Sequence, residues 1–176
     1  MTYTPPASLM EEGEGVPSWS FRDKPVGTVY EGTVVSTEWR QQTDYDTNEP
    51  LWWNQGASKP STVQGPGAQP VWQYVVTLDT DERTGPDDDG RRRDFIKKGK
   101  GGTDVLRQAV KDANLPDLAP GCGYKKQFAG TEPSSNPKFN DKKIYRWKVT
   151  APVAGLGDFD APNAQAPQTV SASETF

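Results

Sequence analysis

The chain contains no histidine and only one cysteine, Cys122, among its 176 residues. The lack of histidine removes the commonest general base, the Ser-His-Asp and Cys-His arrangements, and most zinc sites. The single cysteine excludes an internal disulfide and a thiolate metal cluster. No carboxylate pair or nucleophile–base pattern stands out elsewhere. We therefore expect a protein that is not an enzyme and that uses no metal or other cofactor.

Long apolar runs are also missing. No run approaches the roughly 18 residues of a membrane-spanning helix, and the first residues lack the basic-then-apolar pattern of a signal peptide. Apolar residues make up 32% of the chain, while 17 Gly and 16 Pro favour loops and tails. This composition predicts a cytoplasmic protein without membrane contact.

Charge is distributed unevenly along the chain. The net charge is −4, yet residues 91–148 hold 15 Lys/Arg against 6 Asp/Glu. Residues 1–90 hold 5 against 15, and residues 149–176 hold none against 3. A strongly basic second half is the electrostatic footprint expected of a polyanion binder.

Composition also divides the chain into three parts. Residues 1–16 are rich in Pro, Glu and Gly without periodicity, which predicts a disordered N-terminal segment. Residues 153–176 are rich in Ala, Pro, Gln and Ser and carry only acidic charges, which predicts a flexible acidic tail. The folded domain is expected at 17–152.

Strands dominate the expected folded domain. Residues 26–39 are β-branched and aromatic but are interrupted by Gly27 and Gly32, which predicts a strand with a bulge or bend at a glycine. Residues 40–70 are expected to form a long polar loop. Further strands are predicted at 70–81, 91–98, 122–131 and 142–152.

One helix is expected at 103–116, between the third and fourth strands. Thr103 can cap its N-terminus and Pro116 stops it. The residues at helical spacing are Leu106, Ala109, Val110 and Ala113. Three strands, a helix and two strands are the element order of the OB-fold, a five-stranded Greek-key barrel.

The segment "RRRDFIKK" (91–98) opposes the acidic net charge of the chain. On a strand, alternate side chains share a face. One face is then expected to carry Arg91, Arg93, Phe95 and Lys97, and the other Arg92, Asp94, Ile96 and Lys98. Two interpretations remain open: a solvated edge strand that uses charge against aggregation, or a stripe for phosphates with Phe95 available to stack on a base.

Two later strands also combine basic and aromatic residues. Lys125 and Lys126 precede Phe128, and Arg146 and Lys148 share one face of the last strand. The other face of that strand carries Tyr145, Trp147 and Val149, a pattern that favours a core role for Trp147. Three strands of this kind in one small domain strengthen the nucleic-acid interpretation.

The remaining candidates are aromatic. Trp72 and Tyr74 alternate with polar and apolar neighbours, so they could fill the barrel or lie on its open face. Trp52 and Trp53 lie in the long polar loop, where paired exposed tryptophans would be costly unless they pack or bind something. They are candidates for base stacking or for an interface.

The segments "VWQYVVTLDTDER", "DDDGRRRDFIKKG", "GYKKQFAGT" and "KKIYRWKVTAP" together resemble the OB-fold single-stranded-DNA-binding proteins of actinobacterial phages. The resemblance covers about residues 20–152. It implies a barrel whose basic, aromatic-lined face holds single-stranded DNA in the cytoplasm of a bacterial host. The end of the chain at Phe176 is also similar to tails that recruit replication or recombination proteins, although "SASETF" contains only Glu174 as an acid.

The main hypothesis is therefore sequence-tolerant binding of single-stranded DNA during replication, recombination or repair of a phage genome. The alternatives are an interaction protein of the virion or its assembly and an RNA-binding OB domain. The sequence does not determine the oligomeric state, and a homo-oligomer is one of the states it allows. The candidate DNA-binding residues are Arg91, Arg92, Arg93, Phe95, Lys97, Lys98, Lys125, Lys126, Phe128, Arg146, Lys148, Trp72, Tyr74, Trp52 and Trp53.

Overall fold

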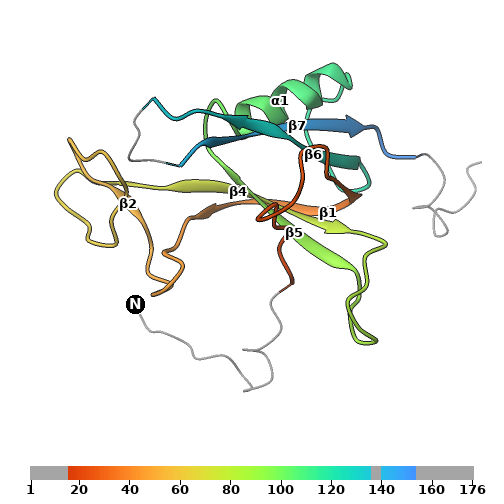
Figure 1. Ribbon diagram of the computed structural model, residues 1–176, viewed down its shortest axis with the longest axis horizontal. Coiled ribbons are helices and arrows are strands. Elements are labelled where there is room, and N and C mark those ends of the chain that lie inside the picture. The colour runs from red at the N-terminus through yellow and green to blue at the C-terminus, as the bar shows by residue number, and fades with distance from the viewer. Residues whose placement is uncertain (1–15, 136–139, 154–176) are drawn as a thin grey trace, which may run out of the picture.

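The computed structural model describes residues 16–135 and 140–153, which contain seven strands and one helix (Figure 1). The elements are β1 Val29–Gln41, β2 Trp52–Trp53, β3 Gln69–Pro70, β4 Trp72–Asp79, β5 Arg91–Lys97, α1 Thr103–Asp112, β6 Gly123–Glu132 and β7 Lys142–Thr150. The expectations for residues 1–15 and 154–176 fall outside this part of the chain. No helix within it is long and apolar enough to cross a membrane.

A five-stranded antiparallel sheet in the order β5-β4-β1-β6-β7 forms the body of the domain. β1 belongs to both halves of the sheet, because Thr33 pairs with Asp79 of β4 and with Gly123 of β6. Gly32 lies beside this change of partner, where an added Cβ would come within 2.6 Å of the Asp79 carbonyl oxygen. The mainly β class predicted from the sequence is confirmed.

Three details of the expected barrel are wrong. The sheet is not closed, because β5 and β7 form no backbone pairing within the described residues. The helix follows β5 instead of lying between strands three and four, since the loop expected at 40–70 contains the short strands β2 and β3. The bulge alternative for β1 is wrong too, because the register shift lies between Val34 and Ser36 and not at a glycine.

A short N-terminal segment, residues 17–22, lies at the free edge of β5, and we call it the strap. The Arg93 N–H donates to the Pro17 carbonyl at 2.8 Å, and the Trp19 N–H donates to the Arg93 carbonyl at 2.9 Å. Phe21 is buried, with its ring centroid 5.2 Å from that of Tyr145 on β7. The strap therefore contacts both β5 and β7, whose edges the closed barrel would have joined directly.

The core lies on the inner face of the curved sheet and is covered by one face of α1. Of the residues predicted at helical spacing, Leu106 and Val110 are buried. Thr103 does not cap the helix: it is the first helical residue, and its hydroxyl accepts a hydrogen bond from the Gly99 N–H at 3.0 Å. The helix ends at Asp112, before the predicted stop at Pro116, and Asn114 then adopts a left-handed φ of 55°.

The predicted alternation of side chains on β5 is confirmed. Arg92, Asp94 and Ile96 are buried on the inner face, whereas Arg91, Phe95 and Lys97 are exposed on the outer face. The period of two therefore buries two charged residues, which need partners because an unpaired buried charge is costly.

Arg92 finds its partners in the turn that precedes β5. Its guanidinium binds both carboxylate oxygens of Asp88, at 2.8 and 2.6 Å, and also contacts Glu82 at 3.2 Å. Only 4% of the Arg92 side chain is exposed. The prediction that Arg92 binds DNA is therefore corrected: the residue holds the β4–β5 hairpin together.

The Asp88–Arg92 pair predicts a pH dependence of stability. The Arg92 guanidinium, together with the N–H groups of Gly90 and Thr84, holds the pKa of Asp88 well below its ordinary value. Because the folded-state pKa is lowered, the stabilisation is complete above the unfolded-state value of about 3.9 and is lost as the pH falls below it. We expect the difference in Tm between the wild type and Asp88→Asn to be constant near neutrality and to shrink below about pH 4. Thermal unfolding followed by circular dichroism measures it, and a difference that stays constant into strong acid would contradict the assignment.

Candidate nucleic-acid interface

A groove of about 800 Å³ lies between the end of β5 and the beginning of β7, and we call it the β5–β7 groove. It exists because the sheet is open at this edge. The basic residues that line its exposed parts are Arg22 of the strap, Lys97 and Lys98 at the end of β5, and Lys142 and Lys143 at the start of β7.

The described part of the chain supplies no ion-pair partner to these cations. None of the five forms an ion pair within residues 16–135 and 140–153; Lys143 donates instead to the Phe21 carbonyl at 3.0 Å. Asp141 and Asp94 are the acids that line the groove, and Asp94 is already paired with a lysine below. The groove is thus strongly positive, although the whole chain has a net charge of −4.

A buried polar network forms the floor of the groove. The Asp94 carboxylate accepts hydrogen bonds from the Lys126 ammonium at 2.7 Å and from the Tyr124 hydroxyl at 2.6 Å. The Trp147 indole N–H donates to the Tyr124 oxygen at 2.6 Å. Burial, followed by the charge of Asp94, raises the pKa of Tyr124 well above its ordinary value, so the phenol remains a donor. The network links β5 to β6 and β7 where the backbone does not.

Two residues predicted to bind DNA, Lys126 and Phe128, are buried beneath the groove and have structural roles. The Lys126 side chain is only 6% exposed, and its ammonium lies 4.6 Å from the Tyr145 ring centroid and 5.0 Å from that of Trp147. Phe128 is buried against Tyr145 and Phe21. Neither side chain is available to a strand of nucleic acid. Trp147 is partly buried against the core, as its face on the last strand predicted.

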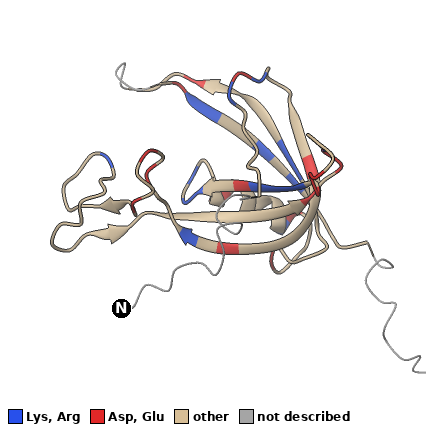
Figure 2. Cartoon of the chain, turned by 90° about the horizontal axis from the view of Figure 1, so that it is seen from below, with Lys and Arg blue, Asp and Glu red and all other residues tan. Residues whose placement is uncertain are grey.

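Lys125, Arg146 and Lys148 lie on a different surface. They project from the outer face of β6 and β7, where Lys125 is directly opposite Lys148 and pairs with Glu31. Figure 2 shows that Lys and Arg lie on strands of both halves of the sheet. The structure therefore does not bring these three predicted residues into the β5–β7 groove.

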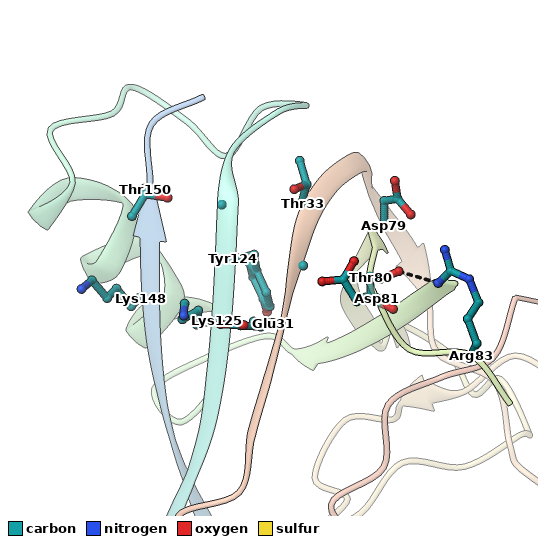
Figure 3. Close-up of a pocket in the computed structure, with 12 residues that line it drawn as sticks. Glu31, Thr33, Asp79, Thr80, Asp81, Arg83, Tyr124, Lys125, Lys148 and Thr150 are labelled. Atoms are coloured by element: carbon teal, nitrogen blue, oxygen red, sulfur yellow. Dashed lines mark hydrogen bonds and ion pairs between the residues drawn. The ribbon is translucent and has the colours of Figure 1, made fainter. Parts of the chain in front are cut away.

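The hollow beside this second surface is balanced in charge. It measures about 460 Å³, and Lys125 and Lys148 lie on one side of it, with Asp79 and Asp81 on the other (Figure 3). The other charged residues of its lining, Glu31 and Arg83, make the numbers of acids and bases equal. A polyanion would meet acids here, so the hollow suits it less well than the groove.

Arg91 and Arg93 of β5 are also poorly placed to bind a strand in the groove. Arg91 is exposed but forms an ion pair with Asp89 at 3.7 Å, at the hairpin end of the strand. Arg93 is partly buried, and the strap is hydrogen-bonded to its backbone. Phe95, Lys97 and Lys98, by contrast, line the groove. Of the basic segment 91–98, the C-terminal end is therefore the part that lines the groove.

Some of the aromatic residues predicted to bind DNA are exposed beside a hollow, and the others pack within the protein. Trp53 and Trp72 are 43% and 40% exposed and line a second hollow of about 750 Å³, beside Lys97 and Lys98. Tyr74 packs against the core, and burial raises its pKa. Trp52 is partly buried on β2, opposite Pro70. Trp53 and Trp72 thus remain available for stacking, whereas Tyr74 and Trp52 have structural contacts.

Sequence reasoning missed four residues of this region. Lys142 and Lys143 are visible in the sequence as a basic pair at the start of the last strand, and this pair was the available signal. Trp39 lines a smaller hollow with Trp72 and Lys98, and its available signal was an aromatic residue near the end of a predicted strand. Arg22 carried no such signal, because its position depends on the strap, which has no strand pattern in the sequence.

The described residues contain no group of three or more Cys, Asp or Glu that could hold a metal ion. No protein-family model, no curated protein and no solved structure matches the chain. The resemblance to phage single-stranded-DNA-binding proteins therefore remains a prediction from the sequence.

Proposed function

We propose that the protein binds single-stranded DNA in the β5–β7 groove, with little dependence on sequence. The observation that carries the proposal is a set of five basic residues along one groove that form no ion pair with any described residue: Arg22, Lys97, Lys98, Lys142 and Lys143. Unpaired cations placed close together repel one another, and a polyphosphate backbone removes that repulsion while releasing counterions.

The aromatic residues of the groove favour a single strand over a duplex. Phe95 is 39% exposed on the outer face of β5, at the wall of the groove. An exposed ring offers a stacking surface that every unpaired base can use, whereas the bases of a duplex are already stacked on each other. Lysine ammonium groups contact phosphates without reading sequence. Together these features support sequence-tolerant binding.

The biological setting of the proposal comes from the sequence resemblance. A protein of this kind would act in the cytoplasm of a bacterial host, during replication, recombination or repair of a phage genome. Recruitment of other proteins through residues 153–176 and assembly into a homo-oligomer remain predictions. Competition between DNA and RNA oligomers of equal length would distinguish DNA binding from RNA binding.

A salt-dependent titration with poly-dT tests the proposal directly. If the groove neutralises roughly three to five phosphates, the logarithm of the affinity should fall with the logarithm of the salt concentration with a slope of about −2 to −3.5. Fluorescence anisotropy of a labelled oligomer measures the affinity. An affinity that does not change with salt, or no binding at low salt, would disprove an electrostatic groove.

A further inference from the structure

Three tryptophans form a row beside the β5–β7 groove. Trp72 on β4 pairs with Gln41 of β1, and Trp39 pairs with Tyr74. Because alternate residues of a strand share a face, Trp39 and Trp72 project from the same face of the sheet. Trp53 comes from β2 in the segment between β1 and β4, which extends away from the rest of the sheet (Figure 1).

All three rings are exposed to an unusual degree. Trp39, Trp53 and Trp72 are 48%, 43% and 40% exposed. Among the described residues, Trp39 has one ring neighbour, Tyr74, at a centroid distance of 5.1 Å. Trp53 and Trp72 have no ring contact with another described residue. Several exposed aromatic side chains close together on one surface are typical of a binding site.

Open space separates neighbouring members of the row. Trp39 and Trp72 line a hollow of about 300 Å³, together with Lys98. Trp72 and Trp53 line the adjoining hollow of about 750 Å³. Trp72 therefore has an open hollow shared with each neighbour, so a flat group could lie against the rings on either side.

Lys98 connects the row with the groove. It lines both hollows of the row and also the β5–β7 groove. Lys97 lines the groove and the larger hollow. Asp44 is the one acid among the described residues that line the two hollows. A chain of phosphates could therefore pass from the groove to the row without leaving the positive surface.

We infer that Trp39, Trp72 and Trp53 form a base-stacking site that continues the β5–β7 groove, with nucleobases lying against their rings. This inference rests on the proposed function, because it assigns a second part of the same strand to a second surface. The groove binds the strand mainly through phosphates, with Phe95 as its one proposed stacking ring. The tryptophan row requires unpaired bases, and it supplies most of the preference for an intact strand over a bare sugar–phosphate chain.

The test compares two ligands of equal length and charge: oligo-dT and an oligomer of abasic deoxyribose phosphates. The wild-type protein is expected to bind oligo-dT more tightly, by roughly 5- to 150-fold for each base that stacks. Trp72→Ala and Trp39→Ala should each weaken oligo-dT binding by a factor in that range and leave the affinity for the abasic oligomer unchanged. Trp72→Phe, which keeps a ring, should retain part of the preference.

Tyr45→Ala is the matched control. Tyr45 is an aromatic residue in the same segment as Trp53 and is 95% exposed, but it lines neither hollow. Its replacement should change neither affinity. Thermal unfolding establishes that each variant is folded, and the affinity for the abasic oligomer shows independently that the groove is intact.

The outcomes separate this inference from the proposed function. Equal, salt-dependent binding of both oligomers by the wild type would overturn the stacking site and leave the groove in place. Loss of abasic binding in the tryptophan variants would also overturn it, because the row would then act on phosphates or on the fold. Failure of the wild type to bind either oligomer would overturn the proposed function itself.

Discussion

Lys97→Glu combined with Lys98→Glu should weaken oligo-dT binding by at least about 25-fold at about 0.1 M salt, because two lost phosphate contacts correspond to a salt exponent of about 1.4 for a single strand. Both residues line the groove, and Lys98 also lies at its junction with the tryptophan row. The salt slope should become shallower by about the same exponent. Both side chains are exposed, so the variant should fold normally.

The matched control is Arg146→Glu combined with Lys148→Glu. It makes the same change in net charge, on exposed residues of β7 that lie outside the groove. If the groove is the binding site, this variant should lose much less affinity than the first and keep its salt slope. Equal losses in the two variants would mean that only the overall charge matters. A larger loss in the control would move the site to the outer face of β6 and β7.

The three basic segments of the sequence do not form one continuous surface. Basic residues at 91–98, 125–126 and 146–148 were combined into one predicted interface because they interleave with aromatics. A strand pattern gives the face of each residue, but it does not say how two strands are oriented in space. β5 and β7 lie at opposite edges of a bent sheet. The outer face of β7 therefore does not continue the surface formed by Lys97 and Lys98.

The expected strands and the helix were found because their signals are local. The alternation on β5 correctly grouped Arg92, Asp94 and Ile96 on one face. It could not show that this face is the buried one, because the partners of Arg92 and Asp94 come from Asp88 and from Lys126, 32 residues away from Asp94. The local sequence pattern of a strand is the same whether its charged residues are buried or exposed.

The open edge of the sheet has a similar explanation. Closure of a barrel depends on tilt and stagger, which no single strand specifies. Here the strap contacts both edges through Trp19 and Phe21, whose neighbours in sequence show no strand pattern. Trp19 also stacks on Tyr30, with ring centroids 5.1 Å apart. These contacts join residues far apart in the chain, and they create the groove on which the proposed function depends.

The buried ion pair between Asp94 of β5 and Lys126 of β6 is expected to contribute strongly to the stability of the fold. Asp94→Ala should lower the free energy of unfolding by about 3–5 kcal/mol, because it leaves the Lys126 ammonium buried without its counter-ion. The Asp94 and Lys126 side chains are only 3% and 6% exposed, so water cannot readily replace the lost carboxylate. The Tyr124 hydroxyl would lose its acceptor as well. Since domains of this kind are stable by only about 5–15 kcal/mol, the loss would bring the variant close to unfolding.

Urea denaturation gives the free energy of unfolding of the Asp94→Ala and Asp104→Ala variants. Comparing the two losses shows how much the burial of the Asp94–Lys126 pair matters. Asp104 forms an ion pair with Arg107 at 2.9 Å, but their side chains are 45% and 58% exposed. Water screens such a pair, so Asp104→Ala should cost less than about 1 kcal/mol. Asp94→Ala with Lys126→Met removes both charges and should recover most of the loss, because the buried ammonium is then gone. A small effect of Asp94→Ala alone, similar to that of Asp104→Ala, would show that the Asp94–Lys126 pair is not what joins β5 to β6 and β7.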